Sequence, residues 1–292
     1  MIGIRAFLET NNLDRDDTIE ELSIDNSKVE WIEPIGLVCL LAIVRHLRYG
    51  IEDHCPISFT YPGKLGYLQR MDLLRHLEVD FPERFRHHSS AGRFVTLQTV
   101  SDMRQVNSIA NDMIQILPAE EDLRALAHYN ITELLDNAFQ HAGASLPPVT
   151  CAQKWMLSRQ AQIAVADCGI GLAASLRQSP WLAPANDKEA VELALQPWTS
   201  GKEDADLGIY GELGNTGNGL SMIRKFAELL GGKLLIISGS AYHRLSADAT
   251  GSCTVSAWPG TVVAVEFPLE LPGSFSSVKS SALRALGRRR RR

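Results

Sequence analysis

The sequence predicts an α/β protein, because strand-like segments with alternating apolar residues are interleaved with helix-like segments that carry apolar stripes. The chain has 292 residues, which is enough for two ordinary domains. Residues 1–88 have the order strand, helix, strand, helix, and residues 93–272 contain further strands and longer helices. We therefore expect a small α/β domain, a polar linker at Phe81–Gly92 and a larger α/β domain.

The cysteine content and the apolar segments favour a cytoplasmic protein. The five cysteines show no CxxC pair and no Cys/His ligand spacing, which favours reduced thiols over disulfides or a zinc site. No apolar run is long enough to span a bilayer, and the N-terminus lacks a signal-peptide pattern. We expect a cytoplasmic chain with no membrane span.

Residues 273–292 have the composition of a disordered basic tail. The net charge is −5 although the last five residues, Arg288–Arg292, are all arginine, so the rest of the chain is more acidic than the total. This acidity argues against nucleic-acid binding by the folded part. Nucleic acid could then be contacted only by Arg288–Arg292. The simpler alternative is that these arginines form a solvated tail.

Four segments account for the first domain. Val29–Ile32 is predicted to be a strand, and Pro34 begins an apolar helix that ends near Gly50. Ile57–Tyr61 alternates like a second strand, and Tyr67–Leu77 is predicted to be a second helix.

The turn between the first strand and the first helix is the sequence Trp31-Ile-Glu-Pro-Ile-Gly-Leu37. It resembles the STAS domain of anti-sigma-factor antagonists, in which a strand ends in a serine-bearing turn followed by Gly-Leu and an apolar helix. Pro34 and Ile35 stand where that family carries its phosphorylatable serine, so we do not expect the phosphorylation switch here. An unrelated α/β cap is the alternative.

The second domain is predicted from apolar periodicity and from turn residues. Its expected elements are strand Phe94–Leu97, helix Met103–Leu117, helix Pro118–Gly143, paired strands Val149–Leu157 and Gln162–Ala166, helix Asp187–Leu195, the glycine-rich loop Pro197–Gly219, helix Leu220–Leu230, and closing strands Lys233–Ile237 and Gly260–Pro268.

The long helix carries one polar stripe on an otherwise apolar segment. Glu133, Asn137 and His141 are spaced four residues apart, so they project from one face. The amide oxygen of Asn137 is a suitable ligand for Mg²⁺, which prefers oxygen. Glu133 could orient or deprotonate a water or hydroxyl that attacks a phosphate. The alternative is a solvated helix face.

Two glycine-containing motifs follow. Asp167-Cys-Gly-Ile-Gly-Leu172 places a carboxylate at a strand end, where it can accept hydrogens from an exocyclic amino group while the glycines allow close backbone approach. Gly214-Asn-Thr-Gly-Asn-Gly-Leu220 leads into a helix, whose free N–H groups and dipole favour a phosphate. An ordinary turn and a flexible loop are the respective alternatives.

Four signals occur in one order: E-x-x-x-N on a helix, DxGxG after a strand, a glycine-rich loop before a helix, and Gly-Thr on a last strand. Together they resemble the GHKL superfamily of ATP-binding proteins over residues 95–269. The resemblance implies a Bergerat-type two-layer α/β sandwich, with a mixed sheet and helices on one face. It also implies ATP and Mg²⁺ as cofactors.

The resemblance assigns a role to each matching position. Asp167 would accept from the adenine amino group, and Thr261 would share a water with it. Gly169 and Gly171 would let the loop close over the base, and Asn137 would hold Mg²⁺. The residues expected on the phosphate side are Gly214, Thr216, Gly217, Asn218, Gly219 and Leu220. Asn218 departs from the leucine of many relatives.

Glu133 stands where hydrolysing members and anti-sigma serine kinases place their base, whereas typical histidine kinases carry asparagine there. The chain therefore looks most similar to bacterial anti-sigma kinases and the ATP-binding proteins near them. Three functions stay open: an ATPase or ATP-driven switch that couples lid closure to partner binding, a protein serine/threonine kinase, and a nucleotide-sensing interaction module without turnover. A regulatory protein partner is expected, and a homodimer is open.

Overall fold

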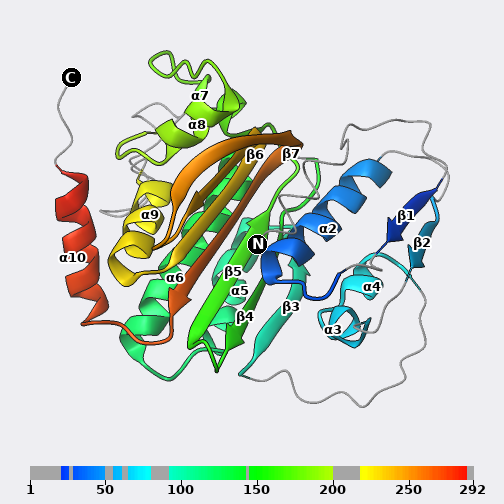
Figure 1. Ribbon diagram of the computed structural model, residues 1–292, viewed down its shortest axis with the longest axis horizontal. Helices are drawn as coiled ribbons and strands as arrows, with labels where there is room; N and C mark the ends of the chain where they lie inside the picture. The colour runs from blue at the N-terminus through cyan, green and yellow to red at the C-terminus, as the bar shows by residue number, and fades with distance from the viewer. Residues whose placement is uncertain are drawn as a thin grey trace.

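The computed structural model describes residues 21–25, 29–49, 55–60, 65–79, 92–142, 145–199 and 218–287 (Figure 1). Its centre is a five-stranded sheet with strand order β3-β4-β5-β7-β6. The strands are β3 (Phe94–Thr99), β4 (Val149–Trp155), β5 (Gln160–Ala166), β6 (Lys233–Leu245) and β7 (Thr250–Pro268). The α/β class predicted from the sequence is confirmed.

Every neighbouring pair in this sheet is antiparallel. The prediction of a mixed sheet is therefore wrong. The connections explain two of the four pairs, because β4 joins β5 and β6 joins β7 through short turns at residues 156–159 and 246–249. Short connections produce hairpins, and hairpins are antiparallel.

Helices cover both faces of the sheet (Figure 1). One face is covered by α6 (Glu121–Ala142), α7 (Gly171–Leu176), α8 (Asp187–Ala194) and α9 (Gly219–Leu230), with α5 (Val106–Ile114) and α10 (Phe275–Leu286) packed against α6 and α9. Alternate residues of β6 divide between the faces: Leu234 and Ile236 pack on this side, and Leu235 and Ile237 on the other.

The second face is covered by α2 (Pro34–Arg48), which packs against β4, β5 and β7. The helices of the predicted second domain all lie on the first face, and α2 comes from the predicted first domain. The strands accommodate both layers, because Leu234–Ile237 and Val262–Val265 are continuously apolar rather than alternating. Continuous apolar runs are typical of strands buried on both faces.

The N-terminal segment matches the prediction in part. The helix that begins at Pro34 is confirmed as α2, and the strand at residue 57 is confirmed as β2 (Ile57–Thr60). Its parallel partner is β1 (Leu22–Asp25), so the predicted strand Val29–Ile32 is wrong. Trp31, with 57% of its surface exposed, stacks on Tyr67 at a ring-centroid distance of 5.8 Å instead of pairing in a sheet.

The predicted helix Tyr67–Leu77 is two short helices, α3 (Leu65–Arg70) and α4 (Leu73–His76). Asp72 separates them with a left-handed φ of 60°. A left-handed residue interrupts the helical hydrogen-bond ladder, and aspartate is one of the few non-glycine residues that adopt this conformation readily.

The C-terminal segment is ordered over α10, so the prediction of a disordered tail at residues 273–292 is wrong for Phe275–Leu286. The Ser274 side chain caps the helix by accepting from the Ser277 N–H group. Val278, Ala282 and Leu286 are spaced four residues apart and are buried against the rest of the helical layer. Arg288–Arg292 lie outside the described residues.

An aromatic cluster fixes α10 to its neighbours. The ring of Tyr129 on α6 meets that of Phe226 on α9 edge-on at 5.5 Å, and the Phe275 ring lies 5.9 Å from Phe226. Aromatic pairs of this kind contribute about 0.5–1.5 kcal/mol each beyond the area they bury. Phe275 N–H also donates to Asp122 Oδ1 at 2.7 Å, which anchors the start of α10 to the start of α6.

We predict that Ala282→Asp lowers the free energy of unfolding by about 3 kcal/mol, because it places a carboxylate in a fully buried site without a partner. The matched control is Ala285→Asp on the exposed side of the same helix, which should change stability by less than about 0.5 kcal/mol. Urea unfolding measures both variants. Equal stability of the two would contradict the docking of α10.

The helices also bear on membrane insertion. Among the described residues, no helix is both long and apolar enough to cross a membrane. The longest, α6, has 22 residues and includes Glu121, Asp122, Glu133 and Asp136.

Candidate functional site

One pocket lies between the helical layer and the sheet. Its lining residues are Leu134, Asn137, Ala138, Val165, Asp167, Gly171, Leu172, Ser175, Leu220, Thr261 and Val263. Five of them were predicted from the sequence as nucleotide-binding positions: Asn137, Asp167, Gly171, Leu220 and Thr261. They come from α6, the end of β5, α7, α9 and β7, so the fold brings together residues that are far apart in the chain.

Asp167 is the buried carboxyl group of this pocket, with 6% of its surface exposed. Its Oδ1 accepts from the N–H groups of Gly169 at 2.9 Å and Thr261 at 3.2 Å. Within the described part of the chain, no group donates to the second oxygen, Oδ2. Burial raises the pKa of Asp167 to about 7, and the two backbone N–H groups oppose that rise. The side chain is thus held in one orientation with an acceptor left for a ligand.

The pairing of β6 with β7, the strand beside β5, is irregular near Asp167. The register of β6 against β7 shifts between Ser238 and Ala241, as is common beside functional sites. Gly260 sits at this irregularity with φ +104°, and a Cβ there would overlap the backbone of Asp167 and Gly169. Only glycine allows this part of β7 to approach the segment Asp167–Gly169 so closely.

Ser238 is a structural residue of the site that was not identified from the sequence. Its Oγ donates to the Gly260 carbonyl at 3.0 Å and accepts from the Leu172 N–H group at 2.8 Å. It therefore joins the start of α7 to β7 at Gly260. Trp258, also not identified, donates from Nε1 to the Asp167 carbonyl at 3.1 Å. The available signal was a serine directly after the apolar run Leu234–Ile237.

We predict that Gly260→Ala lowers the free energy of unfolding by about 3 kcal/mol and weakens ligand binding, because the methyl group is strained at this φ and displaces Asp167. Gly251→Ala in the same strand is the control, since a Cβ there meets nothing within 4 Å. Chemical denaturation of both variants provides the measurement. A Gly260→Ala protein as stable as Gly251→Ala would show that the close approach is not required.

Asn137 lines the pocket on α6, whereas Glu133, one helical turn earlier, is not among the lining residues. Among the described residues, the buried Nδ2 of Asn137 has no hydrogen-bond partner. The N and O atoms of an amide exchange positions by a flip of the side chain, so this group can present either atom to a ligand. Such an unpaired buried amide is costly unless a ligand completes it.

Glu133 lies against the start of α9. A Cβ on Gly219 would overlap Glu133 Oε2 and lie 3.5 Å from Asn137 Nδ2, so Gly219 faces both side chains. Burial and the negative charge of Asp136 raise the pKa of Glu133 to about 7, against the opposing effects of a hydrogen bond from Tyr129 and the charge of Lys279. A carboxylate that titrates near neutrality is suited to accept a proton.

The start of α9 is the part of the predicted phosphate side that the structure describes. Buried Asn218 accepts at Oδ1 from the Trp198 N–H group at 2.9 Å, which ties together the two ends of the glycine-rich segment. Gly219 follows as the first residue of α9, and Leu220 lines the pocket. The remaining predicted positions, Gly214, Thr216 and Gly217, lie outside the described residues.

The residues present fit a purine base at one end of the pocket. Asp167 Oδ2 offers an acceptor to an amino group, and Leu134, Val165 and Val263 provide apolar walls. Pockets of this composition, mostly apolar with a few convergent polar groups, are typical of small-ligand sites.

At the other end of the pocket, the amide oxygen of Asn137 is the side-chain group that could hold Mg²⁺. In the described ranges, no group of three or more His, Cys, Asp or Glu residues could hold a metal ion. Mg²⁺ commonly takes only one or two protein oxygens and completes its shell with phosphate oxygens and waters. Asn137 can supply one such oxygen.

Comparison of the chain with protein-family models, curated proteins and solved structures found no match.

Proposed function

We propose that the chain binds Mg-ATP in this pocket and hydrolyses it, as a GHKL-type ATPase that acts as an ATP-driven switch. The observation that carries the proposal is the carboxyl group of Asp167, which is fixed through Oδ1 and leaves Oδ2 as an acceptor in a largely apolar pocket. A base that turns its six-position toward Oδ2 would be adenine rather than guanine, because adenine presents an amino group there and guanine presents a carbonyl oxygen. A regulatory protein partner belongs to the same proposal.

The two ends of the pocket then have different roles. Asp167 and the apolar walls would bind and orient the base, and Asn137 would hold Mg²⁺ through its amide oxygen. When bound, Mg²⁺ neutralises phosphate charge and so favours attack at the terminal phosphate. The water oxygen would bond to the terminal phosphorus as the bond from that phosphorus to the bridging oxygen breaks and ADP leaves. Glu133 would accept the proton of the attacking water, for which its near-neutral pKa is suited.

The test uses the full chain with Mg²⁺ and γ-labelled ATP, with GTP and EDTA as controls. We expect ATP to bind roughly tenfold or more tightly than GTP, and phosphate to be released only when Mg²⁺ is present. Equal binding of ATP and GTP, or no binding of ATP, would overturn the assignment of the pocket. Label transferred to a protein hydroxyl instead of released phosphate would replace hydrolysis with kinase activity.

A further inference from the structure

A second pocket lies outside the proposed nucleotide site and shares no lining residue with it. It has a volume of about 610 Å³ and opens where α4 and the turn before it meet the edge strand β3 and the start of α5. Its lining residues are Asp72, Arg75, His76, Leu97, Gln98, Thr99, Gln105, Ser108 and Ile109. Seven of these nine side chains are polar or charged, and the volume falls in the range of about 300–1,000 Å³ that is usual for small-ligand sites.

One backbone and one side-chain hydrogen bond hold one wall of this pocket in place. The Leu97 N–H group donates to the Met71 carbonyl at 3.1 Å, and the Leu97 carbonyl lies 2.9 Å from His76 Nε2. Since a carbonyl can only accept, Nε2 carries the hydrogen of that bond. The turn between α3 and α4 is therefore fastened to the outer edge of β3.

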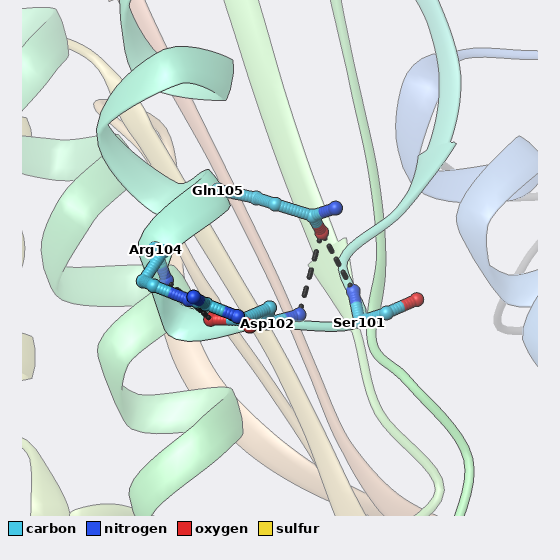
Figure 2. Close-up of polar contacts among 4 residues, drawn as sticks. All are labelled: Ser101, Asp102, Arg104 and Gln105. Atoms are coloured by element: carbon cyan, nitrogen blue, oxygen red, sulfur yellow. Dashed lines mark hydrogen bonds and ion pairs between the residues drawn. The ribbon is translucent and has the colours of Figure 1, made fainter.

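Gln105 fixes the opposite wall (Figure 2). It ends the short 3-10 helix η1 (Met103–Gln105), and its Oε1 accepts from the N–H groups of Ser101 at 2.9 Å and Asp102 at 3.3 Å. The amide nitrogen of Gln105 consequently points away from this turn and keeps its two donor hydrogens for other groups (Figure 2). The wall is held in this orientation before any ligand arrives.

The two charged side chains of the pocket have opposite signs. In the described part of the chain, neither Asp72 nor Arg75 makes a side-chain hydrogen bond or an ion pair. The nearby pair Asp102 and Arg104 behaves differently, because those two side chains bond to each other. A simple anion would be attracted by Arg75 and repelled by Asp72, and a simple cation would meet the reverse. A zwitterion satisfies both.

We propose that this pocket binds a free amino acid, with its carboxylate on Arg75 and its ammonium group on Asp72. The hydroxyl and amide groups of Gln98, Thr99, Gln105 and Ser108 supply further hydrogen bonds to the ligand. Leu97 and Ile109 provide the apolar part of the lining, against which a side chain can pack. The pocket shares no lining residue with the proposed nucleotide site. The helix α5, which forms one of its walls, packs directly against α6.

The test is calorimetric titration of the full chain with each of the twenty L-amino acids. We expect at least one to bind with a Kd below about 1 mM. Its N-acetylated and its amidated derivatives should each bind at least roughly tenfold more weakly, because each removes one of the two charges. Arg75→Gln and Asp72→Asn should each cause a similar loss, and asparagine tolerates the left-handed backbone of position 72. Arg104→Gln, which removes an exposed arginine nearby, is the matched control and should leave affinity unchanged.

No amino acid binding at about 10 mM would overturn the proposal. Binding that survives both Arg75→Gln and Asp72→Asn would also overturn it, since the ligand would lie elsewhere. Loss in Arg75→Gln alone, with the N-acetylated derivative binding as well as the free amino acid, would identify a simple carboxylate site and reject the zwitterion. The unfolding midpoint of each variant, measured without ligand, shows whether a loss comes from misfolding.

Discussion

Replacing Asp167 with asparagine is expected to weaken ATP binding by about a hundredfold. The variant keeps the shape of the side chain, and its amide oxygen can still accept from Gly169 and Thr261. Its amide nitrogen then lies where Oδ2 was, so a donor faces the amino group of adenine. A lost charged acceptor and a buried donor without a partner together cost about 3 kcal/mol, which corresponds to about a hundredfold in Kd.

The measurement is equilibrium binding of ATP to the full chain. Asp136→Asn makes the same chemical change at a carboxyl group on α6 that is not among the pocket-lining residues, and it should leave Kd within about twofold. If both variants bound ATP as tightly as the wild type, adenine would not contact Asp167.

The raised pKa of Asp167 also predicts how the free energy of unfolding depends on pH. Because burial raises the pKa from 3.8 to about 7, the folded state holds this proton more tightly than the unfolded state. The stabilising contribution of the protonated group is complete below about pH 4 and is lost as pH rises through about 7. Asp167→Asn removes this titration, so the wild type should lose stability relative to the variant between about pH 4 and pH 7. Urea unfolding at several pH values measures the difference, and a constant difference would rule out the buried titration.

The site residues that could be predicted from the sequence belong to short local motifs. Asn137 follows from helical spacing, and Asp167 and Gly171 follow from a carboxylate and glycines at a strand end. The structure places these residues around one pocket, together with Leu220 and Thr261. Such motifs can be recognised in the sequence because the backbone geometry that they require is set within a few residues.

The features that were missed depend on contacts between distant segments. Ser238 acquires its role from a register shift in the β6–β7 hairpin, which no local pattern reveals. The docking of α10 depends on three buried apolar residues in a serine-rich segment that resembles a disordered tail in composition. Likewise, α2 covers the second face of the sheet only because the strands are apolar on both sides.

Glu133→Gln is expected to lower the rate of ATP hydrolysis by at least about a hundredfold while ATP affinity changes by less than about threefold. Glutamine has nearly the same shape, so it keeps the packing against Gly219, but it cannot accept a proton from water. Glu121→Gln, the same change at an exposed position at the start of the same helix, is the control and should retain full activity. Steady-state phosphate release and equilibrium binding, measured on the same preparations, separate the two effects.

The pH dependence of turnover gives this prediction a second test. Glu133 must be ionised to accept a proton, so the rate should rise with pH through about 7, the pKa that burial and Asp136 impose. Lys279 opposes that rise in pKa, and its Nζ lies 5.3 Å from the ring centre of Tyr129, which hydrogen-bonds to Glu133. Lys279→Met should therefore move the acidic limb of the profile to higher pH, and Lys279→Arg should restore it. A profile that is unchanged in Lys279→Met, or that persists in Glu133→Gln, would assign the titration to another group.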